Sequence, residues 1–213
     1  MAFSLTMPER DALRVPGLLL LAPFLLVVLW SAHAVFMRGD VSVYAEDGPL
    51  ESLQAGLLAL ACLAYVRAGI AAKGASRAVL LACAWLCFGF VLNELDVEKL
   101  DVPEWLRQLG AGRGRNTLLA LGLGVMAAHA ALRFRAWRQA AVAFLKSPAG
   151  VVLMLAAPLL FAGRVAEKSP AIPHHAYWEE LLELAADCLI LLSAWTAARA
   201  AAAPGSGGPR PGR

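Results

Sequence analysis

Residues 16–36 read PGLLLLAPFLLVVLWSAHAVF and contain no charged side chain. A helix needs about 20 apolar residues to cross a hydrocarbon core of about 30 Å, so this stretch is long enough to span a bilayer. The whole chain has the same character, because 60% of its 213 residues are hydrophobic and 16% are charged. Soluble domains average roughly 45–50% apolar and about 25% charged residues. The composition therefore excludes a cytosolic enzyme, a DNA-binding module and a disordered regulator.

Five more apolar stretches follow the first. Together they predict an all-α integral membrane protein, a six-helix bundle in a single domain covering residues 1–203. The predicted spans are residues 16–36, 50–70, 77–95, 116–134, 148–165 and 177–199. The fourth is rich in glycine and the fifth contains Pro158, and membrane helices tolerate both residue types. Residues 204–213 read PGSGGPRPGR, a composition typical of a disordered tail.

Residues 31–34 (SAHA) resemble the small-residue cleavage site of a signal peptide. However, the acidic residues Glu9 and Asp11 precede the apolar run, which is longer than that of a signal peptide. We therefore expect the first span to be retained.

Lysine and arginine are unevenly divided between the two ends of the predicted bundle. Twelve of the nineteen lie in the N-terminus, the loops 67–77 and 133–146, and the C-terminus. Because positively charged loops stay on the cytoplasmic side, both termini are predicted to be cytoplasmic. Arg133, Arg135 and Arg138 are expected to meet anionic lipid headgroups there, and no nucleic acid is needed to explain them.

The acidic residues are divided more sharply, and fourteen of the sixteen lie at the opposite, outer end. Membrane insertion does not require this, because Asp and Glu contribute little to topology. Three clusters account for most of them. Residues 46–51 begin the second span, where acids complement the helix dipole, whereas residues 93–98 end the third span, where acids oppose it.

The third acidic cluster opens the sixth span. Glu179, Glu180, Glu183 and Asp187 share one helix face about 100° wide, at about 100° per residue. Counted from Trp178 at about 1.5 Å per residue, Asp187 lies about 13 Å deep, close to the bilayer midplane. A carboxylate there costs about 2.5–3.5 kcal/mol and requires a partner. That partner is a shared proton, a bridging cation or an arginine.

Residues on other spans could complete this site. Glu51 and Glu94 come from the first and second acidic clusters, and with Glu183 and Asp187 they form the predicted cation or proton site. Arg164 is the candidate arginine at the outer end of the fifth span. His33 could contribute an imidazole and Gln54 a neutral amide.

Two weaker candidates lie near this site. His175 is one turn before Glu179 and could join a metal site. Arg113 and Arg115 lie in the glycine-rich loop 110–116, at a helix start that could hold an anion such as a lipid phosphate. Just before that loop, the apolar pattern of residues 100–109 predicts a short interfacial helix.

Glu46-Asp47-Gly48 followed by Glu51, the acids that close the third span and Glu179-Glu180 resemble motifs of small uncharacterised polytopic bacterial inner-membrane proteins. The resemblance covers the six-span layout and implies a location in the bacterial inner membrane. It implies no activity.

Three functions are compatible with the sequence. The leading hypothesis is an integral membrane protein whose outward-facing acidic site binds a cation, a proton or a cationic group during transport. The first alternative is a membrane-embedded enzyme acting on a lipid or lipid-linked substrate, which would require a divalent metal as cofactor. The second is a structural or assembly subunit, in which Arg164 pairs with the acids and no small molecule binds.

Overall fold

The computed structural model describes residues 7–95, 97–99 and 101–202. The predicted tail 204–213 and Asp96 of the second acidic cluster therefore lie outside the described residues. Within those ranges the chain forms helices and no strand, which confirms the predicted all-α class.

The helices follow one another with short connections. In chain order they are α1 (Met7–Ala32), the π-helix η1 (His33–Met37), the 3-10 helix η2 (Val41–Tyr44), α2 (Pro49–Ala71), α3 (Gly74–Glu94), the 3-10 helix η3 (Val97–Lys99), α4 (Glu104–Gly110), α5 (Gly112–Leu132), α6 (Phe134–Leu145), α7 (Pro148–Glu167) and α8 (His175–Ala202). The short helix predicted over residues 100–109 corresponds to α4.

Five segments of the described chain are long and apolar enough to cross a membrane by themselves. They are Pro16–Met37, Val41–Ala71, Gly74–Glu94, Pro148–Glu167 and His175–Ala202. The predicted fourth span corresponds to α5, which passes the same test only together with α6, and the two helices are bent by 109°. The described part of the chain therefore has five membrane-length apolar segments, or six if the bent pair forms one span.

The prediction of a loop over residues 133–146 is wrong, because Phe134–Leu145 form the helix α6. Its half-buried side chains, among them Trp137 and Phe144, recur at helical spacing, and α6 packs against α3 and α7. Arg135 and Arg138 are exposed. This is an amphipathic helix, and the loop was predicted because these residues lie between two apolar spans.

The core lies between four helices: α2 packs against α3 and α8, and α7 packs against α8. Most of the buried core residues are alanines, and such small side chains let helix backbones approach closely. A buried hydrogen-bond chain crosses this core, in which the Tyr65 hydroxyl and Ser193 Oγ are 2.7 Å apart and Ser193 Oγ donates to the Ala149 carbonyl at 2.7 Å. It joins α2, α8 and α7.

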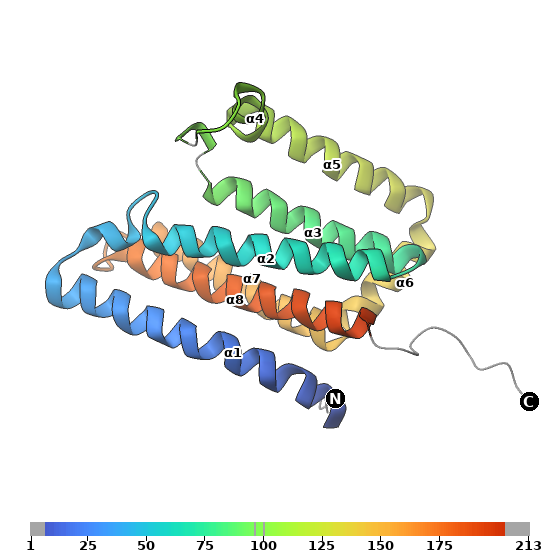
Figure 1. Cartoon of the computed structure of the whole chain (residues 1–213), viewed down its shortest axis with the longest axis horizontal. Coiled ribbons are helices and arrows are strands. Elements are labelled where there is room, and N and C mark those ends of the chain that lie inside the picture. The colour runs from blue at the N-terminus through green and yellow to red at the C-terminus, as the bar shows by residue number, and fades with distance from the viewer. Residues whose placement is uncertain (1–6, 96, 100, 203–213) are drawn as a thin grey trace, which may run out of the picture.

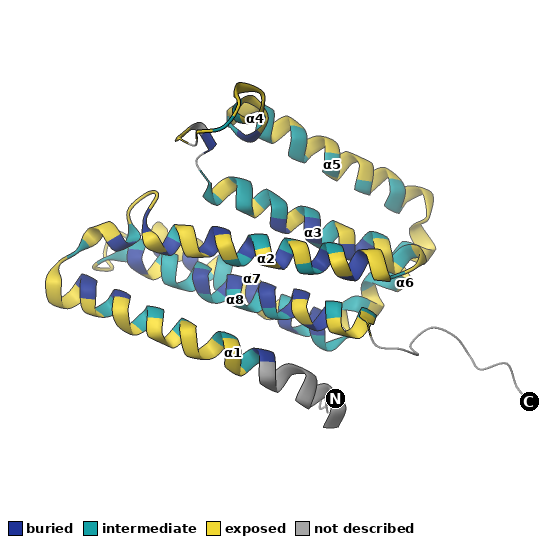
Figure 2. Cartoon of the chain, viewed as in Figure 1, coloured by how far each residue is buried: buried dark blue, intermediate teal, exposed yellow. Residues whose placement is uncertain are grey.

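The two remaining long helices lie at the edges of this core (Figure 1). α1 runs along α8, and α5 lies on the outer side of α3. Figure 2 shows that the buried positions concentrate in α2, α7 and α8, and no residue of α5 is buried. α5 is therefore the most loosely held of the long helices.

The starts of α2, α5 and α8 and the ends of α1, α3 and α7 meet at one end of the bundle, on the left in Figure 1. We call this the acidic end and the opposite one the basic end. The chain between α1 and α2 turns here, and Asp40 accepts hydrogen bonds from the Ser42 backbone N–H at 3.1 Å and from its hydroxyl at 2.6 Å. These bonds lower the pKa of Asp40, the hydroxyl contributing most.

Candidate functional site

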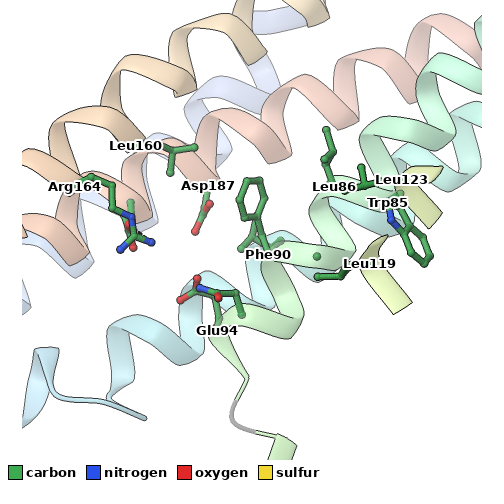
Figure 3. Close-up of a pocket in the computed structure, with 13 residues that line it drawn as sticks. Trp85, Leu86, Phe90, Glu94, Leu119, Leu123, Leu160, Arg164 and Asp187 are labelled. Carbon is green, nitrogen blue, oxygen red and sulfur yellow. Dashed lines mark ion pairs between the residues drawn. The ribbon is translucent and has the colours of Figure 1, made fainter. Parts of the chain in front are cut away.

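A cavity of about 390 Å³ lies between α3, α5, α7 and α8 towards the acidic end. Glu94 from α3, Arg164 from α7, and Glu183 and Asp187 from α8 line it (Figure 3). We call it the acidic cavity. Three of the four predicted site carboxyls and the predicted arginine thus meet around one space.

Asp187 is the most deeply buried carboxyl of the cavity and is 4% exposed. It makes no hydrogen bond or ion pair with any residue that the structure describes. In Figure 3 its carboxyl points from α8 into the space between Arg164, Glu94 and Phe90. Buried polar groups in native proteins have partners in the large majority of cases, so an unpaired carboxyl of this kind calls for one.

Arg164 interacts with other carboxyls and not with Asp187. Its Nη1 lies 3.2 Å from Glu179 Oε1 and 3.4 Å from Glu167 Oε2, and its Nη2 lies 3.6 Å from Glu183 Oε1. The arginine side chain is 57% exposed. Gly163 permits this contact between α7 and α8, since a Cβ there would lie 3.3 Å from Glu183 Cγ. The guanidinium therefore neutralises charge at the edge of the cavity and leaves Asp187 without a cation.

Gln54 holds Glu180 away from the cavity. The Gln54 side chain is fully buried, and its Nε2 donates to the Glu180 carbonyl at 2.9 Å and to Glu180 Oε2 at 3.0 Å. Both residues belong to the α2–α8 contact, and neither is among those that line the acidic cavity. Their role in the structure is to support α8.

Glu51 lines a neighbouring space, which we call the polar pocket. Its volume is about 430 Å³, and its lining includes Glu51, Lys99, Arg115 and Glu94. Glu51 accepts a hydrogen bond from the Asp47 backbone N–H, and Lys99 pairs with the Asp47 carboxylate. Because Glu94 lines both spaces, the polar pocket and the acidic cavity adjoin at this carboxyl.

The histidines lie apart from the cavity. His33 is exposed on η1, and His175 is half-buried at the start of α8 with its Nδ1 unpaired. Neither lines the acidic cavity or the polar pocket. Among the residues that the structure describes, no group of three or more His, Cys, Asp or Glu side chains could hold a metal ion.

The glycine-rich segment before α5 is a closely packed corner between α4 and α5. A Cβ on Gly114 would lie 1.7 Å from the Gln108 carbonyl oxygen, so the two helices meet there without room for a loop. Arg115 Nη1 donates to the Leu92 carbonyl at 3.0 Å and so closes the end of α3, while Arg113 is exposed. Arg115 is thus engaged with the backbone of α3, and an anion site at the two arginines stays a prediction.

The remaining side chains that line the cavity were missed by sequence reasoning. Apart from Asn93 at the end of α3, they are apolar or aromatic residues from α2, α3, α5 and α7: Leu58, Trp85, Leu86, Phe90, Leu119, Leu123 and Leu160. Apolar residues inside apolar helices carry no signal that separates a cavity wall from a lipid-facing surface, so the sequence could not indicate them.

Comparison with known proteins gives no relative for this chain: no protein-family model, no curated protein and no solved structure matches it.

Proposed function

We propose that this is a polytopic membrane protein whose acidic cavity binds a cationic group or a proton, with Asp187 as the central binding residue. The observation that carries the proposal is the burial of Asp187, which is 4% exposed and unpaired within the described chain while it faces a cavity. A carboxylate held this way at bilayer depth costs about 2.5–3.5 kcal/mol unless a positive charge or a proton compensates it.

The balance of charges supports a cationic ligand. Glu94, Glu183 and Asp187 line the cavity, and one guanidinium, that of Arg164, stands against them. That guanidinium also contacts Glu179 and Glu167. The space is thus short of positive charge, and an anion or a phosphate would be repelled from it.

A route for the ligand is supported by the shared wall at Glu94. The polar pocket lies at the acidic end of the bundle, and it adjoins the acidic cavity at Glu94. A cation that moves between Asp187 and the polar pocket passes Glu94 and Glu51, so the pocket connects the acidic cavity with the acidic end of the bundle. This connection is the basis for proposing transport or exchange through the cavity.

We propose that the chain crosses the bacterial inner membrane six times, with both termini in the cytoplasm. α3 ends at the acidic end and α7 begins at the basic end, so the chain between them has to return across the membrane (Figure 1). α5 has 21 residues and is about 30 Å long, which is enough for that crossing. The excess of lysine and arginine at the basic end supports its cytoplasmic location.

Removing the charge of Asp187 tests the proposal. Purified protein in nanodiscs is titrated calorimetrically with ethylammonium chloride and with sodium chloride, at several pH values. We expect Asp187→Asn to weaken binding at least tenfold, because an amide cannot balance a positive charge, and Glu183→Gln to weaken it less.

Glu104→Gln is the matched control, since it removes a carboxylate from the exposed surface of α4, where Glu104 pairs with Arg107. Its binding should equal that of the unaltered protein. Unchanged binding in both Asp187→Asn and Glu183→Gln would contradict the proposal. If the unaltered protein binds neither cation and Asp187→Asn is more stable than it, the protein is instead a structural subunit. The ion pairs of Arg164 with Glu179 and Glu183 also fit that function.

A further inference from the structure

The acidic cavity has an apolar half next to its charged half. Asp187, Glu94 and Arg164 lie on one side, and the opposite side is formed by Phe90, Leu119, Leu123 and Trp85 (Figure 3). Glu183 also lines the cavity and contacts Arg164. The volume of about 390 Å³ exceeds what a bare inorganic ion fills. It falls within the range of roughly 300–1,000 Å³ found for small-molecule sites, which are mostly apolar with a few placed polar groups.

The apolar half is not closed towards the surroundings. Leu86, Phe90 and Leu123 line the cavity and are still 51%, 42% and 47% exposed. They lie on α3 and α5, and Leu86 and Leu123 are near the middle of these helices, far from the acidic end. α5 has no buried residue, so no other part of the described chain covers the side of the cavity that α5 forms. The cavity is therefore open at the depth of the hydrocarbon core.

We propose that the ligand of this cavity is a cationic amphiphile, an alkylammonium group with a hydrocarbon chain, which enters from the bilayer between α3 and α5. The head binds at Asp187 and the chain lies along Phe90, Leu119 and Leu123 towards Trp85. This inference rests on the proposed function, because it names the class of cation that the site takes.

The polar groups suit an ammonium head. An ammonium group has three N–H donors and no acceptor, and the carboxyls of Asp187, Glu183 and Glu94 supply acceptors from two helices. A neutral amphiphile would leave the Asp187 charge uncompensated. A calcium ion takes six to eight oxygen ligands, whereas the described chain holds no cluster that could bind a metal.

Two probes that share a hydrocarbon tail and differ in their head group test the two parts of the ligand separately. The probe is a dodecylammonium ion brominated at the tail end, which quenches tryptophan fluorescence on contact. The full-length protein in phosphatidylcholine nanodiscs is titrated with it. Six tryptophans contribute fluorescence, so Trp85→Phe defines the part of the signal that comes from the cavity. A brominated dodecanol, with the same tail and a neutral head, is the matched control probe.

We expect saturable quenching by the amine that depends on Trp85, and weaker quenching by the alcohol by a factor of at least ten. Asp187→Asn should raise the apparent Kd of the amine at least tenfold. Leu86→Phe, which narrows the apolar half of the cavity from α3, should raise it about tenfold while leaving the Kd of ethylammonium unchanged. Leu119→Phe repeats this test from α5, and each variant is required to elute as a single species in size exclusion.

The outcomes distinguish this inference from the proposed function. If both phenylalanine variants bind the brominated amine as tightly as the unaltered protein while Asp187→Asn still weakens it, the cavity takes a cation without a tail. If the brominated dodecanol quenches Trp85 as strongly as the amine, the inference is overturned as well, because binding then does not depend on the charge of the head group. If Asp187→Asn changes neither amine nor ethylammonium binding, the proposed function itself fails.

Discussion

Gln54 is a fully buried amide that connects α2 to the first turns of α8. Both of its hydrogen bonds go to Glu180, one to the carbonyl oxygen and one to the carboxyl. Gln54→Leu removes both bonds at a similar volume and leaves the Glu180 carboxyl without its donor. We expect the free energy of unfolding to fall by about 1–2 kcal/mol, measured by reversible unfolding in mixed micelles.

Gln108→Leu is the control for this change. Gln108 is exposed on α4 and donates to Glu104 at 3.2 Å, so its amide is already in contact with solvent. Its replacement should alter the free energy of unfolding by less than about 0.5 kcal/mol. A loss of the same size in both variants would show that the buried hydrogen bonds of Gln54 contribute nothing specific.

The residues of α8 show what the sequence could predict at this scale. Helical periodicity placed Glu183 and Asp187 on one face, one turn apart, because the angle between them is a property of any α-helix. It could not assign their partners: Arg164 contacts Glu183 and not Asp187, and Gln54 takes Glu180. Partners depend on how helices from distant parts of the chain are placed, and one sequence contains no measure of that distance.

Two glycines of α5 provide a test at the scale of the element. A Cβ on Gly122 would lie 2.2 Å from ring atoms of Trp85, whereas a Cβ on Gly124 would meet nothing within 4 Å. Gly122→Ala therefore pushes α5 away from α3 and displaces a side chain that lines the cavity. We expect it to lower the free energy of unfolding by about 1–3 kcal/mol and to shift Trp85 fluorescence.

Gly124→Ala is the matched control, two residues further along the same helix. With no neighbour to displace, it should leave Trp85 fluorescence unchanged and stabilise the helix by about 0.5–1 kcal/mol, since alanine is the better helix former. Equal effects of the two substitutions would mean that α5 does not rest on α3 through Gly122.

Helix α6 shows where the prediction from sequence was wrong at the element scale. Residues 133–146 were expected to form a loop because they lie between two predicted spans, and their arginines were counted toward the cytoplasmic side. Arg135 and Arg138 occupy the exposed side of the amphipathic helix α6, and Phe144 on its other side packs against the core. The apolar stretches predicted the long helices more reliably, since a hydrogen-bonded helix is what an apolar segment of that length forms in a bilayer.

At the scale of the whole molecule, the division of charge along the bundle predicts its orientation. Lysine and arginine outnumber acids at the basic end, and Asp187, Glu183 and Glu94 belong to the excess of acids at the other end. The described chain begins and ends at the basic end, since α1 starts and α8 finishes there (Figure 1). Six crossings would keep both ends of the described chain on one side of a membrane, whereas five would put them on opposite sides.

Cysteine labelling in intact cells tests both the orientation and the number of crossings. Single cysteines are introduced at exposed positions, Lys168 and Arg113 at the acidic end and Lys73 and Lys146 at the basic end, and treated with a membrane-impermeant maleimide. We expect Lys168→Cys and Arg113→Cys to react at once and Lys73→Cys and Lys146→Cys to react only after permeabilisation. The unaltered chain is the control, because its four cysteines lie within the apolar helices α2, α3 and α8.

The pair Arg113 and Lys146 decides whether α5 crosses the membrane. These residues flank the bent pair α5 and α6, one at each end of it. Opposite labelling means that α5 crosses and that the acidic cavity has a membrane-spanning wall on its α5 side. Labelling of both from the same side would make the bent pair a re-entrant segment, and the opening between α3 and α5 would then face water instead of lipid. In that case a soluble cation would reach Asp187 directly, and the hydrocarbon chain proposed for the ligand would lose its physical basis.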